Sequence, residues 1–148
     1  MNDVVNMVVI GDTNLVQHML SVGQDDAGTY ALTAVYQGDV NNRTSRSAQL
    51  DQIVEPTSSS ATIRSSLNPS IPGQPVTFTA TITSPTVLPT GPVTFTAGKA
   101  VLGTGQLKGG IAQITTTTLQ GSTNIKVTYG GNSNIAGSNA WLTQIVRR

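Results

Sequence analysis

The chain of 148 residues contains 37% hydrophobic, 4% aromatic and 10% charged residues, with a formal net charge of +1. An average domain has roughly 25% charged residues. In this chain Ser, Thr, Val and Gly make up for the small number of charged residues, and this composition favours short strands and polar turns over helices. The absence of cysteine excludes disulfide bonds and thiolate metal sites.

The first 55 residues contain strand-like segments at residues 8–15, at residues 30–36 and in a run that ends with Val54. Residues 14–22 are ambiguous, because Leu15, Met19 and Val22 would share one helix face. We expect a distorted strand or a short helical turn there. Residues 55–60, a proline followed by a polar run, predict a linker between two strand-rich regions.

Beyond this linker, strands alternate with turns. Residues 76–83 alternate strictly and place Val76, Phe78, Ala80 and Ile82 on one face. About seven strands are expected, with turn signals at intervals of about 8 to 12 residues, as is typical of a sandwich. They cover residues 61–66, 76–83, 92–96, 101–102, 111–115, 124–129 and 141–146. The pattern predicts a short first domain at residues 1–55 and a complete β-sandwich at residues 56–148.

Two motifs of the first region return in the second. Tyr36-Gln37-Gly38-Asp39 returns as Tyr129-Gly130-Gly131-Asn132, and Gln52-Ile53-Val54 returns as Gln144-Ile145-Val146. The spacing of roughly 90 residues is the length of one immunoglobulin-like sandwich rather than of a solenoid repeat. Residues 8–15 line up with residues 94–102, so the two opening strands have no counterpart in the first copy. We therefore expect that copy to be truncated at its N-terminus.

Several motifs of the second region carry a family resemblance. They are Asn68-Pro69-Ser70, residues 73–81, Pro89-Thr90-Gly91 with Val93-Thr94-Phe95, Leu102-Gly103-Thr104, and residues 127–134. Through these motifs, residues 57–146 resemble the tandem bacterial Ig-like repeats of large surface and secreted proteins. The resemblance implies an all-β fold, an immunoglobulin-like β-sandwich used in tandem for adhesion, display or spacing. It implies no catalytic residues.

The first region departs from this pattern because its opening strands are missing. Residues 26–30 nevertheless resemble a tyrosine corner, in which the Tyr30 hydroxyl bonds to nearby backbone. An incomplete sandwich exposes a hydrophobic face to water unless something covers it. The members of that face are Val8, Ile10, Leu32, Ala34 and Tyr36. Three arrangements would account for this face: disorder of the first region, docking onto the second unit, or pairing with another chain. We favour the last, a closed homodimer formed by strand pairing or domain swapping.

The charges are divided unevenly between the two regions. All seven acidic residues lie in the first 55 positions, whereas six of the eight basic residues lie in the remainder. This division indicates electrostatic complementarity between units or between chains; divergence of the two repeats is the alternative. The basic residues are too scattered for nucleic-acid binding, so no nucleic-acid partner is expected.

Catalytic groups are scarce. His18 is the only histidine and no G-x-S-x-G motif accompanies it, so a Ser-His-Asp site is not expected. Asp25 and Asp26 are adjacent and would point to opposite faces of a strand, whereas Asp39 belongs to a hairpin turn. We therefore expect no enzymatic activity. A weak hydrolase in the acidic first region is the alternative.

Two kinds of ligand contact remain as candidates. Ca²⁺ would take several carboxylate oxygens, and the available ligands are Asp25, Asp26, Asp39, Asp51 and Glu55. Their spacing fits no EF-hand loop, so we expect them to solvate turns and expect no cofactor. Trp141 either packs against an edge or neighbouring strand, or is exposed and stacks on a sugar or anchors a partner.

The sequence thus predicts a non-enzymatic structural or adhesive repeat, flanked by Ig-like repeats in an extracellular or surface-exposed bacterial protein. Self-association would occur through the first region. The alternative is a module that binds a glycan or a host surface protein through exposed loops or Trp141. No run approaches the about 20 apolar residues of a membrane span. Residues 1–5 lack the basic start of a signal peptide, which we expect elsewhere in the parent protein.

Overall fold

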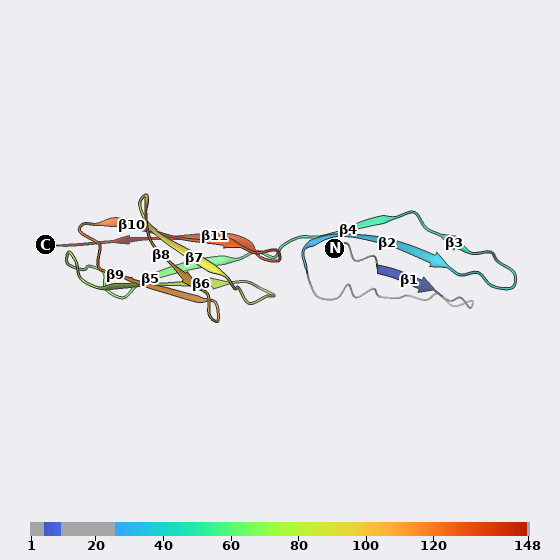
Figure 1. Ribbon diagram of the computed structural model, residues 1–148, viewed down its shortest axis with the longest axis horizontal. Coiled ribbons are helices and arrows are strands. Elements are labelled where there is room, and N and C mark those ends of the chain that lie inside the picture. Colours follow the sequence, from blue (N-terminus) through green and yellow to red (C-terminus); the bar gives the residue numbers. More distant parts are fainter. Residues whose placement is uncertain (1–4, 10–25, 148) are drawn as a thin grey trace. The chain divides into compact units, whose positions relative to one another are not determined.

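The computed structural model describes residues 5–9 and 26–147 of the chain. The chain divides into two compact units, Met1–Glu55 and Pro56–Arg148, called unit 1 and unit 2 below. Every regular element in the described residues is a strand (Figure 1), so the all-β prediction is confirmed. These residues also contain no helix that could cross a membrane.

Unit 2 is a sandwich of two antiparallel sheets. Its strands are β5 (Ser60–Ser65), β6 (Val76–Thr83), β7 (Pro92–Ala97), β8 (Ala100–Gln106), β9 (Ile111–Thr116), β10 (Thr123–Gly131) and β11 (Ala136–Gln144). One sheet has the order β11-β10-β7-β8 and the other the order β5-β6-β9. Two facing sheets of four and three strands form the immunoglobulin-like sandwich that the sequence predicted.

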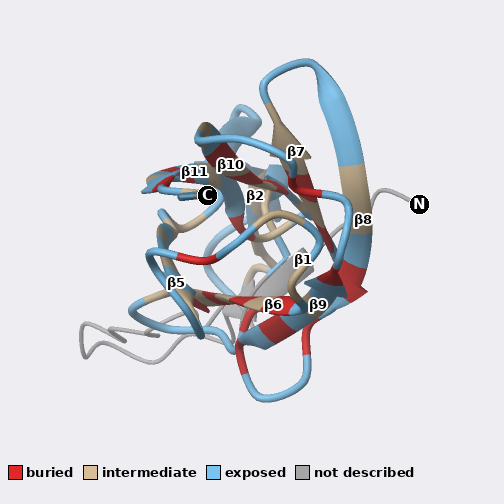
Figure 2. Ribbon diagram, turned by 90° about the vertical axis from the view of Figure 1, so that its left-hand side faces the viewer, coloured by how far each residue is buried: buried red, intermediate tan, exposed pale blue. Residues whose placement is uncertain are grey.

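The core of unit 2 lies between the inner faces of these sheets (Figure 2). On β6 the predicted face is confirmed, since Val76, Phe78 and Ala80 are fully buried and Ile82 is 1% exposed. β7 and β10 contribute the facing layer, with Val93, Phe95, Ile125, Val127 and Tyr129. Each large apolar side chain buried in this way stabilises the fold by about 1.5–3 kcal/mol.

Two strands of unit 2 are longer than predicted. β8 continues to Gln106 and β11 begins at Ala136. Gly103 and Gly105 lie inside β8. A Cβ atom at Gly105 would meet the Gln113 carbonyl oxygen at 3.1 Å, so glycine allows β8 to approach β9.

A seam of hydrogen bonds joins the residues that flank the first strand of unit 2, β5, to those that flank the last strand, β11. At one end Thr57 bridges Ile135, and at the other Ser70 bridges Val146, in both cases parallel. The Thr57 N–H donates to the Asn134 carbonyl at 2.9 Å, and the Ser70 N–H to the Ile145 carbonyl at 3.0 Å. The seam therefore covers the edge of β11 that faces away from β10.

Gln144 lies beside the Ser70–Val146 bridge, and its side chain is fully buried. Its Oε1 atom accepts a hydrogen bond from the Ser65 hydroxyl at 2.7 Å. Its Nε2 group donates to the Leu67 carbonyl at 2.8 Å and lies 3.2 Å from the Ser70 hydroxyl. A buried amide is tolerated here because both of its polar ends are bonded.

Unit 1 is built around one central strand. Its strands are β1 (Val5–Val9), β2 (Gly28–Tyr36), β3 (Ser45–Arg46) and β4 (Leu50–Val54). β3 and β4 pair antiparallel with β2, but β1 pairs parallel with it. In unit 2 the corresponding strand is β7, which contains the first residues of the range 94–102, and it pairs antiparallel with β10. The predicted match of residues 8–15 with residues 94–102 is therefore wrong for β1. A parallel pair needs a crossover of about a dozen residues, and residues 10–27 provide that length.

None of the residues described between Asp26 and Glu55 is buried. On the face expected to be hydrophobic, Leu32 and Tyr36 are half-buried and Ala34 is exposed. Ile10 and the side chain of Val8 lie outside the described residues, as do residues 14–22, for which a distorted strand or helical turn was expected. The described part of unit 1 is thus a sheet without a closed core.

Gly131 provides a direct test of the turn that follows β10. Its φ is +79°, and a Cβ atom would lie 2.8 Å from the Gly137 backbone nitrogen. We expect Gly131→Ala to destabilise unit 2 by more than about 1 kcal/mol in thermal unfolding. Gly130→Ala is the matched control, because a Cβ atom there would meet nothing within 4 Å and its φ is not positive. Equal unfolding temperatures for the two variants would contradict this role of Gly131.

Candidate functional site

The turn after β2 and the turn after β10 have the same construction. Gly38 has a φ of +82° and Gly131 a φ of +79°. In unit 1 the Asp39 Oδ1 atom accepts the N–H groups of Asn41 and Asn42 at 2.7 and 2.8 Å. In unit 2 the Asn132 Oδ1 atom accepts the two equivalent N–H groups, both at 2.9 Å. The repeat seen in the sequence is therefore also a repeat of backbone geometry.

The strand register confirms this correspondence and locates one difference. Tyr36 pairs with Ser45 in unit 1 as Tyr129 pairs with Ser138 in unit 2. Leu32, four residues before Tyr36 on β2, pairs with Leu50. The register of the Tyr36–Ser45 pair would place residue 49 opposite Leu32 instead. Unit 1 therefore holds one extra residue between β3 and β4, a bulge-like irregularity that unit 2 lacks.

Asp39 differs from Asn132 in its charge and in one further bond. The Tyr36 hydroxyl donates to the Asp39 Oδ2 atom at 2.6 Å. This bond, together with those from the Asn42 amide and the backbone, lowers the pKa of Asp39 to about 2. The same bond raises the pKa of Tyr36. The Tyr129 hydroxyl instead donates to the Thr90 carbonyl at 3.0 Å.

The predicted tyrosine corner is present in unit 1. The Tyr30 hydroxyl donates to the Asp26 carbonyl at 2.6 Å, four residues upstream. This bond fixes the chain where it enters β2.

The candidate carboxylates do not form one site in the described residues. Asp26 precedes β2 and Asp39 follows it, so the nine-residue strand separates them by about 26–30 Å at a rise near 3.3 Å per residue. Paired carboxylates in glycosidases lie within about 10 Å of each other. Asp25 and His18 lie outside the described residues. No three metal-ligating side chains gather in the described parts of the chain, and the calcium site stays a prediction.

Trp141 lies on the outer face of β11 and is 64% exposed. It is directly opposite Lys126 on β10, whose ammonium group is 5.7 Å from the ring centroid. A cation at this distance over an indole ring is attracted by its π-electrons. The sequence did not indicate Lys126, because its position beside Trp141 depends on the cross-strand register.

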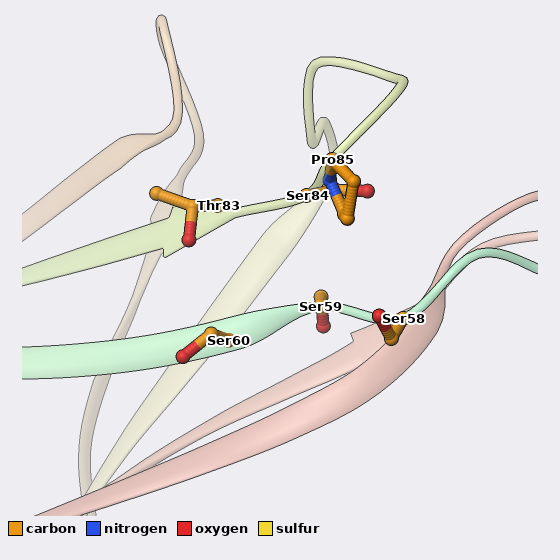
Figure 3. A pocket seen from close by; sticks show the side chains of 6 residues that line it. All are labelled: Ser58, Ser59, Ser60, Thr83, Ser84 and Pro85. Atoms are coloured by element: carbon orange, nitrogen blue, oxygen red, sulfur yellow. The ribbon is translucent and has the colours of Figure 1, made fainter.

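A pocket of about 330 Å³ lies where β5 begins and β6 ends. Figure 3 shows the residues that line it, which are Ser58, Ser59, Ser60, Thr83, Ser84 and Pro85. The Ser84 hydroxyl oxygen is buried and has no hydrogen-bond partner among the described residues. The lining holds hydroxyls but no ionisable group that would serve as an acid or a base.

Strand β4 shows large apolar side chains to solvent, with Leu50 62% and Ile53 59% exposed. Its one partner strand in the described residues is β2. An edge strand that combines apolar side chains with unpaired backbone groups favours association with another strand.

Comparison with known proteins identifies a family for unit 2. The family model described as bacterial Ig-like domain (group 3) matches residues 62–147, more than half of the chain. A solved structure of the fibronectin(III)-like modules of Clostridium thermocellum CbhA is 16% identical, with a TM-score of 0.49. The match covers 82% of this chain and 63% of that one. No curated protein matches the sequence.

The lowered pKa of Asp39 predicts how the first turn responds to acid. Because the folded pKa, about 2, is below the ordinary value of 3.8, the charged carboxylate stabilises the turn above about pH 4. That contribution is lost as the pH falls towards 2. We expect the Asp39 carboxyl carbon to titrate near pH 2 in an NMR experiment, with the amides of Asn41 and Asn42 shifting together.

Asp39→Asn is the matched variant, because Asn132 makes the same two backbone contacts without a charge. It should keep the turn and remove the shift of these amides with pH. The turn around Asn132 should not respond. Titration of Asp39 near pH 4 would contradict the bonding described above.

Proposed function

The chain belongs to the bacterial Ig-like domain family, group 3, and on this basis we propose that it is a structural or adhesive repeat of an extracellular bacterial protein. Its role is to space or to present neighbouring modules, without catalysis. Modules of this family are typically non-catalytic, and the described residues gather no acid–base pair. The second alternative from the sequence, a hydrolase in the acidic region, has no supporting observation.

The tandem repetition of one hairpin is the observation that carries this proposal. The turns at Asp39 and Asn132 share their bonds and their register. β4 ends at Val54 and Thr57 already bridges Ile135, so Glu55 and Pro56 alone connect the last strand of unit 1 to the first bridge of unit 2. Proline and the residue before it have restricted backbone angles, so such a link suits a spacer.

We further propose that the chain associates with a second copy through unit 1. The support is the exposed strand β4, with the apolar side chains of Leu50 and Ile53, and the lack of buried residues in the described part of this unit. Two identical chains joined at equivalent strands form a closed dimer. The uneven charges of the two regions are compatible with this arrangement.

Light scattering after size-exclusion chromatography tests this association. We expect a mass twice that of one chain, maintained at high salt because strand pairing and apolar contact are not screened. Replacing both Leu50 and Ile53 with Lys should shift the protein towards monomer. Val101→Lys is the control, because it charges a residue in unit 2 that is 66% exposed. A monomer at every salt concentration would overturn the association, and a dimer lost only in salt would assign it to charge.

Trp141 favours a second candidate function, the binding of a glycan or a protein surface. A largely exposed indole beside a lysine offers a stacking face and a hydrogen-bond donor. The neighbouring Thr143 hydroxyl donates to the Asn124 Oδ1 atom at 2.9 Å, which adds polar groups to the same sheet face.

Titration with soluble oligosaccharides, monitored by fluorescence, separates the two functions. The chain has one tryptophan, so its emission reports on Trp141 alone. A spacer should give no saturable change, and this is the result we expect. A saturable change that disappears with Lys126→Ala would favour the binding module, with Lys108→Ala as the control lysine.

A further inference from the structure

The repeated Gln-Ile-Val motif has one copy at the end of β4 and the other at the end of β11. Gln52 pairs with Tyr30, and Gln144 pairs with Thr123. Gln52 donates to the carbonyl of the following residue, Ile53, at 3.0 Å. Gln144 makes the same local bond to Ile145 at 3.2 Å. The two side chains therefore have the same sequence context, register and local hydrogen bond.

Their surroundings differ. Gln144 is fully buried, because the segment from Thr57 to Ser70 lies against it and bonds to both ends of its amide. Gln52 is exposed, and no described residue occupies the equivalent place beside it. Its amide keeps the local bond, but the described residues of unit 1 offer it no partner of the kind that Ser65 and Leu67 supply in unit 2.

The adjacent leucines show the same contrast. Leu142 on β11 is partly buried and packs against the core of unit 2. Leu50 holds the corresponding position on β4, opposite Leu32, and is 62% exposed. An uncovered glutamine and an uncovered leucine thus lie two residues apart on the same face of one strand.

We propose that the edge of β4 facing away from β2, which pairs with no other strand in the described residues, is an acceptor site for an added strand with the chemistry of residues 57–70, lying parallel to β4. A hydroxyl of that strand donates to the Gln52 Oε1 atom, and one of its backbone carbonyls accepts from the Nε2 group. In unit 2 the corresponding segment bonds to the β11 side at Thr57 and Ser70, and Ser65 and Leu67 bond to the Gln144 amide. The inference rests on the proposed function in one respect, that unit 1 is an incomplete copy of the repeat.

Charge favours this occupant. Residues 57–70 carry one charged side chain, Arg64, and no acidic one. Asp51 and Glu55 on either side of Gln52 are both exposed and acidic. A strand with a net positive charge is therefore attracted to this edge.

A synthetic peptide of residues 57–70 tests the site when it is added to the intact chain. We expect saturable binding in an NMR titration, with the shifts concentrated in the amides of residues 50–54. Gln52→Ala should weaken binding about tenfold, because it removes both polar contacts of the amide. A peptide with Ser65→Ala should also bind more weakly. Gln52 is exposed, so its replacement leaves the fold intact, which the spectrum of the free variant verifies.

Gln37→Ala is the matched control, since Gln37 is an exposed glutamine of unit 1 outside β4. A scrambled peptide of the same composition controls for charge alone. Absence of binding would overturn the proposal. Equal affinity for the Gln52→Ala chain, or for the scrambled peptide, would also overturn it, because the contact would then not depend on this site.

The result is separable from that of the association test. A dimer that binds no peptide would refute the acceptor site and leave the dimer standing. A monomer that binds the peptide would support the acceptor site and refute self-association. A dimer that the peptide dissociates would support both, with the dimer contact at β4.

Discussion

The edge of a β-sheet presents unpaired N–H and C=O groups, and the satisfaction of these groups governs the behaviour of both units. In unit 2 the segment before β6 crosses to β11 and closes the edge with two parallel bridges and the buried amide of Gln144. With this side closed, Phe78, Phe95 and Tyr129 are buried in the core between the sheets. A polar seam thus borders an apolar interior.

Unit 1 shows the same hairpin without that closure in the described residues. Tyr129 reaches the Thr90 carbonyl in unit 2, whereas Tyr36 turns to the carboxylate of its own turn. Unit 1 has Asp39 where unit 2 has Asn132. The Asp39 carboxylate gives the Tyr36 hydroxyl a charged acceptor, whereas the Tyr129 hydroxyl uses the carbonyl of Thr90. Local hydrogen bonding thus maintains a turn that packing does not support.

The sequence predicted features that depend on local pattern, and it missed those that depend on register between strands. Strict alternation identified the buried face of β6, and Asp26–Tyr30 was correctly interpreted as a tyrosine corner. The neighbours Lys126 and Trp141 are fifteen positions apart and meet only through pairing of β10 with β11. β8 was predicted too short, at residues 101–102, because the close approach of Gly105 to β9 has no local signal. The candidate contact residues Asp25, Asp26, Asp39 and Trp141 stay predictions.

The placement of the two bridges in unit 2 has a mechanical consequence. Thr57 and Val146 lie near opposite ends of the unit, since Ile135, the partner of Thr57, is separated from Val146 by about 36 Å at the usual rise per residue. Tension between the two ends therefore acts along the strands and across both bridges at once. The hydrogen bonds of Thr57, Gln144 and Ser70 are then loaded in shear, so the force is distributed over all of them and they break together rather than one after another.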